Sequence, residues 1–171
     1  MKQELIFKVI EIKGIEKLLA LSTEVNPSAD QYGKSYAFDW QKPSKNNPAI
    51  FVGAFSVFTD ELLGYLHLSV INSKIPNRYF QSFPFLDYVH TETAILQHIE
   101  VKPESRRMYI AHELLQYAIA WAKDKYDEMY LLGMASYNDT AIHHLFEPYG
   151  AIFSKRYSHS SQLYENFYVS L

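Results

Sequence analysis

The sequence predicts one α/β (α+β) domain over residues 1–171, with a mixed, mostly antiparallel central sheet flanked by helices. Three observations lead to this prediction. A chain of 171 residues has the length of one domain. Its 48% hydrophobic and 20% charged residues are typical of a folded globular protein. Strand-like and helix-like segments alternate, and a hairpin followed by strand–helix–strand crossovers gives a mixed sheet.

The N-terminal half is expected to contain a strand, a helix and a β-hairpin. Apolar residues recur at helical spacing from Ile15 to Leu21. Two β-rich runs are separated only by Thr59-Asp60-Glu61, which favours a hairpin. Proline and aromatic residues without a clear period predict loops before and after it. The expected elements are strand Leu5–Ile12, helix Ile15–Val25, loop 28–48, strands Ile50–Phe58 and Leu62–Ile71, and loop 72–90.

The C-terminal half continues the alternation of strands and helices. Apolar residues at steps of four, four and three from Ile110 to Trp121 give one helix an apolar face. Gly150 is expected to break the chain after a short helix. The expected elements are strand Ile95–Val101, helix Arg107–Tyr126, strand Met129–Met134, helix Thr140–Phe146, and strands Ala151–Tyr157 and Leu163–Val169 around a Ser-His-Ser-Ser turn.

Composition argues against several classes of function. A net charge of -3 gives no broad attraction for nucleic acid, and the absence of cysteine excludes disulfides, thiolate metal sites and a cysteine nucleophile. The first residues alternate charged and apolar side chains, unlike a signal peptide, and no run approaches the ~18 apolar residues of a membrane span. We therefore expect a cytoplasmic protein that binds neither nucleic acid nor membrane.

The turn after the strand ending at Val101 predicts an anion site. The first N–H groups of a helix lack intrahelical partners and, with the helix dipole, attract an anion. Arg106 and Arg107 add two positive charges at this point. A pyrophosphate would match this arrangement, and the alternative is that both arginines belong to a solvated surface.

This segment resembles the signature of the GCN5-related N-acetyltransferases (GNAT), in which a strand ending near V-x-P precedes Q/R-x-x-G-x-G/A and a helix. Val101-Lys102-Pro103 matches the strand exit, Arg106 the first signature position and Ala111 the last. Tyr109 stands where the family prefers glycine. Because a backbone N–H binds the phosphate in that family, tyrosine can supply the donor, although its ring adds bulk.

A second match lies downstream. Asn138 and Ala141 fit the N-x-x-A of the family, and Gly150 fits its later glycine with about one extra residue. The resemblance implies a GNAT-like acyl-CoA N-acyltransferase fold and acetyl-CoA as co-substrate. It implies coenzyme contacts at Ile99, Val101, Arg106, Arg107, Met108, Tyr109, Ile110, Ala111, His112, Asn138, Ala141 and Phe146.

The resemblance also implies direct transfer of the acetyl group, with a backbone N–H near Ile99 to Val101 stabilising the oxyanion. The family often takes its general acid from a tyrosine on the helix after Asn138. Phe146 is nearest in spacing but has no proton to give, so Tyr149, three residues on, is the candidate.

The general base must be found near the same strand. Some acetyltransferases carry a glutamate six residues before the valine, where this sequence has Ile95. Strand alternation puts His98 and Glu100 on one face and Gln97 on the other. We take Glu100 as the leading candidate, with Glu92 or water-mediated deprotonation as alternatives.

The predicted activity is N-acetylation of a primary amine of a small molecule or peptide. The aromatic loops at Tyr32–Trp40 and Tyr79–Tyr88 are expected to recognise the acceptor. The alternatives are a non-catalytic acyl-CoA-binding or regulatory module, favoured by Tyr109 and Phe146, and an unrelated α/β protein. A homodimer is left open. His143 and His144 diverge by about 100° on a helix and are read as its surface, so we predict no metal.

Overall fold

The computed structural model describes residues 4–10, 15–25, 49–71, 92–125, 129–136, 139–153, 157–159 and 162–170. The two predicted loops over 28–48 and 72–90, with their aromatic residues, lie outside these ranges. None of the helices in the described part of the chain combines the length and apolar character that a membrane span requires.

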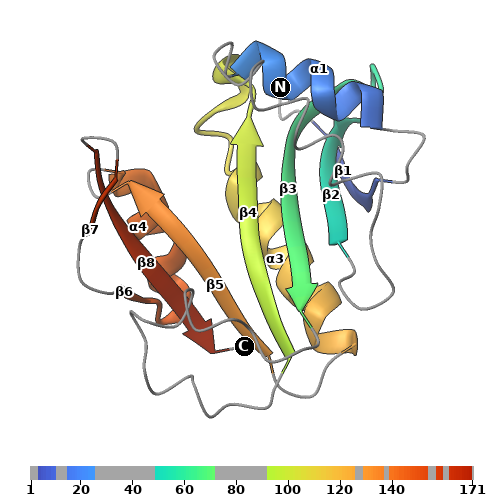
Figure 1. Cartoon of the computed structure of the whole chain (residues 1–171). Helices are drawn as coiled ribbons and strands as arrows, with labels where there is room; N and C mark the ends of the chain where they lie inside the picture. The colour runs from blue at the N-terminus through green and yellow to red at the C-terminus, as the bar shows by residue number, and fades with distance from the viewer. Residues whose placement is uncertain are drawn as a thin grey trace.

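Eight strands of the described residues form one sheet in the order β1-β2-β3-β4-β5-β8-β6, and β7 also pairs with β8 (Figure 1). Only β4 and β5 are parallel, which confirms the predicted mixed, mostly antiparallel sheet. The strands are β1 Leu5–Val9, β2 Ala49–Ser56, β3 Leu62–Ile71, β4 Glu92–Val101, β5 Met129–Ser136, β6 Ile152–Phe153, β7 Tyr157–His159 and β8 Gln162–Ser170.

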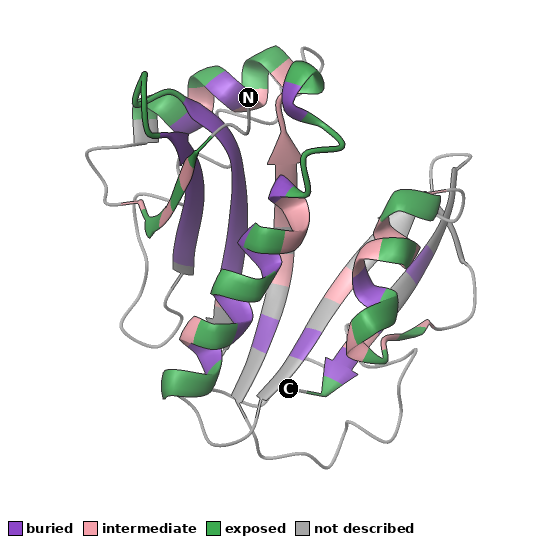
Figure 2. Ribbon diagram, turned by 180° about the vertical axis from the view of Figure 1, so that it is seen from behind, coloured by how far each residue is buried: buried purple, intermediate pink, exposed green. Residues whose placement is uncertain are grey.

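Helices cover both faces of the sheet. Helix α1 (Ile15–Val25) lies on one face, and α3 (Ile110–Lys125) and α4 (Thr140–Phe146) lie on the other (Figures 1 and 2). Helix α3 starts three residues later than predicted. Arg107 and Tyr109, with φ angles of 67° and 60°, cannot be helical.

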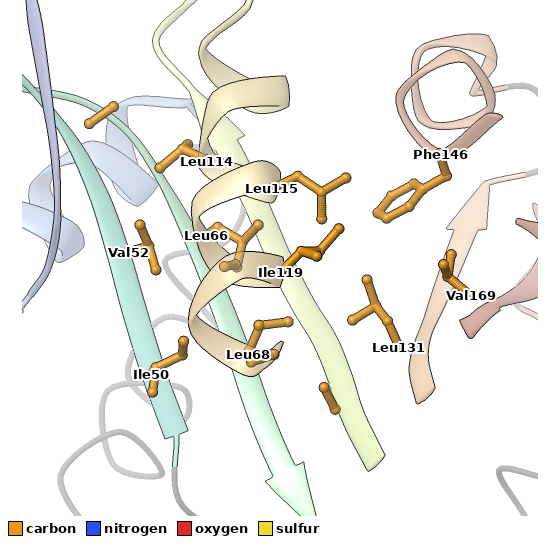
Figure 3. Packing of buried hydrophobic residues seen from close by; sticks show 14 of the residues in the cluster. Ile50, Val52, Leu66, Leu68, Leu114, Leu115, Ile119, Leu131, Phe146 and Val169 are labelled. Carbon is orange, nitrogen blue, oxygen red and sulfur yellow. The ribbon is translucent and has the colours of Figure 1, made fainter. Parts of the chain in front are cut away.

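Two hydrophobic clusters hold these layers together. On the α3 face, Leu114, Leu115 and Ile119 pack over Val52 and Leu66 of the sheet (Figure 3). On the α1 face, the buried leucines of the helix pack on aromatic residues of β2 and β3. This second cluster contains Leu18, Leu21, Phe51, Phe55, Leu62 and Tyr65.

The predicted ends of several strands are wrong. Strand β1 ends at Val9 instead of Ile12, and β4 starts at Glu92 instead of Ile95. In the range expected to be a single strand, Ala151 to Tyr157, the described residues Ile152–Phe153 form β6 and Tyr157 begins β7, and both strands pair with β8. A short α-helix, a 3-10 turn (η6, Glu147–Tyr149) and Gly150, with φ of 68°, precede them, so the predicted break at Gly150 is correct.

The sheet splits between its two parallel strands. Residues Glu92–Ile95 of β4 pair with Met129–Leu132 of β5, after which the two strands diverge (Figure 1). A β-bulge also interrupts β4, because His98 and Leu96 pair with consecutive residues of β3 and Gln97 is inserted between them. The C-terminal half of β4 therefore has one side open toward β5.

Candidate active site

The loop between β4 and α3 has an unusual backbone. After the 3-10 turn η5 (Pro103–Ser105), Arg107 and Tyr109 both have positive φ. Such angles cost a non-glycine residue roughly 1–2 kcal/mol. Tyr109 is 78% exposed, so few packing contacts of its side chain offset this cost. It adopts the left-handed conformation for which glycine is the usual residue.

Substitutions at Tyr109 should separate backbone strain from side-chain size. We expect Tyr109→Val to be less stable than Tyr109→Gly by about 1–2 kcal/mol, because a β-branched residue tolerates positive φ least. Urea denaturation of both variants measures this difference. A glycine variant less stable than the valine variant would contradict the strained geometry.

Helix α3 begins directly after this loop, and its first backbone N–H groups form the end of the helix next to the loop. The Glu113 N–H donates to the Tyr109 carbonyl at 3.0 Å, so the intrahelical bonds begin there. The N–H groups of Ile110, Ala111 and His112 precede the first such bond and are available to an anion. The Ile110 side chain is buried, so only its backbone can contribute. The loop thus has the geometry of the predicted anion site.

A cavity of about 850 Å³ adjoins this helix N-terminus. Its volume is within the usual range of small-molecule and cofactor sites. It brings together ten of the predicted site residues. They are Ile99, Glu100, Val101, Arg106, Arg107, Tyr109, Ile110, Ala111, His112 and Ala141.

Sequence reasoning missed the other walls of the cavity. Asp139 is the N-cap of α4, and its carboxylate accepts the N–H groups of Ala141 and Ile142 at 3.2 and 3.3 Å. An aspartate directly before a short helical pattern was the available signal. The further lining residues not predicted are Val25, Ser105, Asp139, Ile142, His144 and Leu145.

Backbone groups of β4 point into the opening between the strands. Lys102 donates its N–H to a carbonyl of β3 at 2.8 Å, and hydrogen-bonded pairs alternate along an antiparallel ladder. Glu100 is therefore in the next hydrogen-bonded pair. Ile99 and Val101 direct their N–H and C=O groups away from β3, and the Val101 carbonyl accordingly accepts from Arg106 Nε at 3.2 Å.

The Glu100 side chain lies on the α1 face of the sheet. Tyr65 of β3 donates its hydroxyl to Glu100 Oε2 at 2.9 Å. Burial raises the pKa of Glu100, and hydrogen bonds from Tyr65 and Ser22 oppose part of that rise. A raised pKa makes Glu100 a stronger base than an exposed carboxylate when it is ionised.

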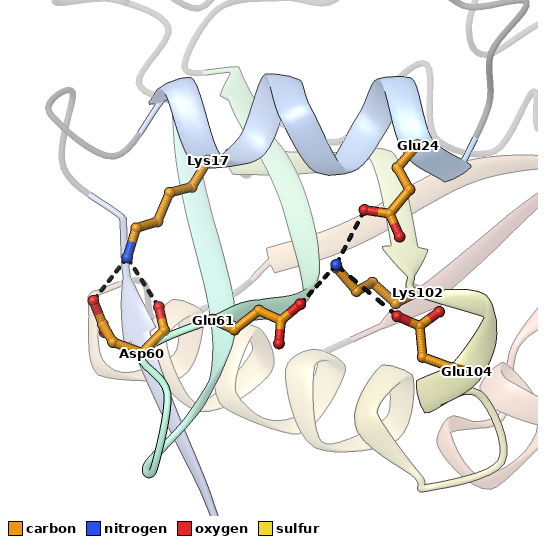
Figure 4. A network of polar contacts seen from close by, with 6 residues as sticks. All are labelled: Lys17, Glu24, Asp60, Glu61, Lys102 and Glu104. Atoms are coloured by element: carbon orange, nitrogen blue, oxygen red, sulfur yellow. Dashed lines mark hydrogen bonds and ion pairs between the residues drawn. The ribbon is translucent and has the colours of Figure 1, made fainter.

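An ion-pair network fixes α1 next to the exit of β4. Lys102 Nζ contacts Glu61 at 2.8 Å, Glu24 at 3.0 Å and Glu104 at 3.9 Å (Figure 4). Glu24 precedes Val25, which lines the cavity, and Lys102 follows Val101, which lines it as well. One ammonium group thus joins two walls of the cavity.

Four predicted site residues are not brought into the cavity. Phe146 is fully buried against Phe167, with ring centroids 4.4 Å apart, and does not line the cavity, so its predicted coenzyme contact stays a prediction. Tyr149 does not line the cavity, and its ring lies beside that of His112, at 6.1 Å between centroids. Exposed Met108 does not line it either, and Asn138 lies outside the described residues.

The structure also distinguishes Glu100 from two other titratable residues of β4, His98 and Glu92. His98 shares the α1 face with Glu100, and burial lowers its pKa. Glu92 is the first residue of β4, at the opposite end from Glu100, and its side chain lies outside the described ones.

The profile of the Acetyltransferase (GNAT) family matches residues 14–150 of the sequence. The chain belongs to the GNAT acetyltransferase family. This confirms the family suggested by the loop after Val101. No curated protein sequence matches the chain significantly.

Solved GNAT-like structures share the fold. A probable acetyltransferase from Staphylococcus epidermidis superposes with a TM-score of 0.70 at 18% identity, covering 98% of this chain and 99% of the other. The ribosomal-protein-S18-alanine N-acetyltransferase of Escherichia coli gives 0.68 at 11% identity, covering 98% and 94%. Arabidopsis thaliana NAA60, solved with acetyl-CoA, gives 0.67 at 12% identity, covering 98% of each chain.

Proposed function

We propose that this GNAT protein transfers the acetyl group of acetyl-CoA directly to a primary amine of a small molecule or peptide. The observation that carries the proposal is a cavity lined both by a cationic helix terminus and by an acidic residue. Its lining includes the N-terminus of α3 with Arg106 and Arg107, here called the donor end, and Glu100 of β4. An anionic acyl donor and an amine can therefore meet in this cavity.

The donor end suits the pyrophosphate of coenzyme A. Arg106 and Arg107 would neutralise phosphate charge, and the N–H groups of Ile110, Ala111 and His112 would donate to phosphate oxygens. The pantetheine would then follow the open side of β4 toward Glu100.

Glu100 is the proposed general base. The amine nitrogen attacks the thioester carbonyl, its proton passes to the Glu100 carboxylate, the C–N bond forms and the C–S bond breaks. The N–H groups of Ile99 and Val101 point toward the opening and are the proposed donors to the developing oxyanion.

The leaving thiolate needs little assistance. An alkyl thiol such as that of cysteine has a pKa of about 8.5, so a thiolate departs near neutral pH without a strong acid. Burial raises the pKa of the Tyr149 hydroxyl, but that residue does not line the cavity. We therefore assign no general acid to Tyr149.

The second candidate function is a non-catalytic acyl-CoA-binding module. The observation in its favour is that Phe146 lies in the core and Tyr149 lies beside the cavity, so neither supplies an acid. This candidate shares the donor end of the cavity and differs only in turnover.

Coenzyme binding and turnover test the proposal together. Calorimetry with acetyl-CoA should detect binding, and thiol release with a panel of amines and peptides should detect transfer. Replacing Arg106 and Arg107 by alanine should weaken acetyl-CoA binding by about 1–2 kcal/mol, or roughly 5- to 30-fold. Binding without turnover on any acceptor would favour the module, and no binding would contradict both candidates.

Lys123 and Lys125 provide a matched control. They lie in the last turn of the same helix α3, and their replacement by alanine removes the same charge far from the cavity. The control should keep the wild-type affinity. Equal weakening in both double variants would show a general charge effect and contradict the placement of the pyrophosphate.

A further inference from the structure

Tyr65 is the residue most firmly tied to Glu100. It stands directly opposite Glu100 in the β3–β4 register, and its hydroxyl donates to Oε2 at 2.9 Å. The Tyr65 side chain is only 1% exposed and packs with Leu18 and Leu21 of α1. Because packing fixes the ring, the hydroxyl is held in one place.

Glu100 accepts a hydrogen bond from this fixed donor and is also one of the residues that line the cavity. Ser22 on α1 provides a second hydrogen bond to the same carboxylate. Two elements, β3 and α1, therefore hydrogen-bond Glu100, and β3 lies on the other side of β4 from the opening toward β5. A charge-assisted hydrogen bond favours the ionised form of a carboxylate and restricts its rotation.

We propose that Tyr65 is a positioning residue that holds Glu100 by Oε2, in its ionised form, so that its other oxygen can accept the proton of the acceptor amine. This inference rests on the proposed function, since Glu100 acts as a base only if acyl transfer occurs in this cavity. Tyr65 does not line the cavity and acts only through Glu100.

The other titratable groups on the α1 face of the sheet are less suited than Tyr65 to position Glu100. Burial lowers the pKa of His67 on β3 and of His98 on β4, so neither imidazole adds a positive charge near neutral pH. Lys102, directly after β4, is engaged by Glu24 of α1 and by two further carboxylates. Among the described residues, Tyr65 and Ser22 are the neighbours of Glu100 whose hydroxyls can be removed without changing any charge.

The test compares wild type with Tyr65→Phe, which keeps the ring and removes the hydroxyl. In the resting protein, 13C NMR titration of the Glu100 carboxyl should show a pKa raised by about one unit. Turnover needs ionised Glu100, so the acidic limb of kcat/KM against pH should move upward by the same amount. Ser22→Ala should raise the pKa of Glu100 by a smaller amount. If Tyr65→Phe does not fold, this variant still tests whether hydrogen bonds to Glu100 set its titration.

Tyr117→Phe on α3 is the matched control, because this partly exposed tyrosine does not line the cavity, and it should leave both measurements unchanged. An unchanged Glu100 titration in Tyr65→Phe overturns the inference. An active wild type whose acidic limb stays in place in Tyr65→Phe overturns it as well. A shifted Glu100 titration in a protein without turnover overturns the proposed function and, with it, this catalytic role.

Discussion

Replacement of His143 by alanine should lower the free energy of unfolding by about 3 kcal/mol. His143 Nε2 of α4 contacts Oε1 of Glu165, a residue of β8 that is only 5% exposed. Without this neighbour the buried carboxylate loses its contact with a nitrogen, and leaving a buried polar group unsatisfied costs roughly 1–3 kcal/mol, with charged groups at the upper end. We therefore expect a loss of about 3 kcal/mol for this carboxylate. Urea denaturation at neutral pH measures the loss.

His144 is the matched control on the same helix. It pairs with Glu147 at 3.7 Å, and both side chains are about four-fifths exposed, so His144→Ala should change stability by less than about 0.5 kcal/mol. Adding Glu165→Leu to His143→Ala should recover part of the loss, since the buried charge is then removed. Equal effects of the two histidine variants would contradict the assigned role of His143.

The two adjacent histidines also show the limit of prediction from sequence. Both were interpreted as a helix surface, which fits His144, whereas His143 is only partly exposed and contacts buried Glu165. Helical periodicity gives the direction of each side chain, but it does not say which strand lies beneath the helix. The partner Glu165 is more than twenty residues away, and only the pairing of β5 with β8 brings it under α4.

Local patterns predicted most elements of the fold. The helix Ile15–Val25 was predicted with its observed bounds, because its apolar spacing is a property of the segment itself. The bulge at Gln97 was not predicted, since it depends on how β4 registers with β3. The bulge changes which residues share a face. Leu96 and Ile99 both pack on the α3 side, although strict alternation would separate them.

The loop after Val101 was the most predictable part of the site, because its function depends on backbone geometry and nearby charges in one short segment. Tyr109 in the position of a glycine raised the question of whether that geometry survives. Its φ of 60° shows that the loop adopts the glycine-like conformation with tyrosine in place. The burial of Phe146 was not predicted, because the direction of its side chain depends on contact with Phe167 of β8.

Stability should fall as the pH falls from 6.5 toward 3, with a large share of the loss due to His67. This residue is buried between Phe51 and His98, at ring-centroid distances of 4.2 and 6.4 Å. Burial, assisted by the charge of His98, lowers the pKa of His67 from 6.5 to about 3. Between pH 6.5 and pH 3, His67 therefore binds a proton in the unfolded chain but not in the folded protein.

The size of this effect follows from proton linkage. Each pH unit below 6.5 removes about 1.4 kcal/mol until the pH approaches 3, which gives about 2 kcal/mol at pH 5. His67→Phe keeps an aromatic ring against Phe51 and has no proton to bind. Between pH 7 and pH 5 the free energy of unfolding should decrease in both proteins. The decrease should be about 2 kcal/mol smaller in His67→Phe than in wild type.

Carboxylates also titrate in this range, so the comparison must be a difference between two proteins. Urea denaturation of wild type and His67→Phe at pH 7, 6 and 5 subtracts the carboxylates, which both proteins share. His98→Ala should reduce the pH dependence only in part, because it removes the smaller of the two causes that lower the pKa of His67. Parallel stability curves for wild type and His67→Phe would mean that the folded protein accepts a charge at this position, contrary to its burial under α1.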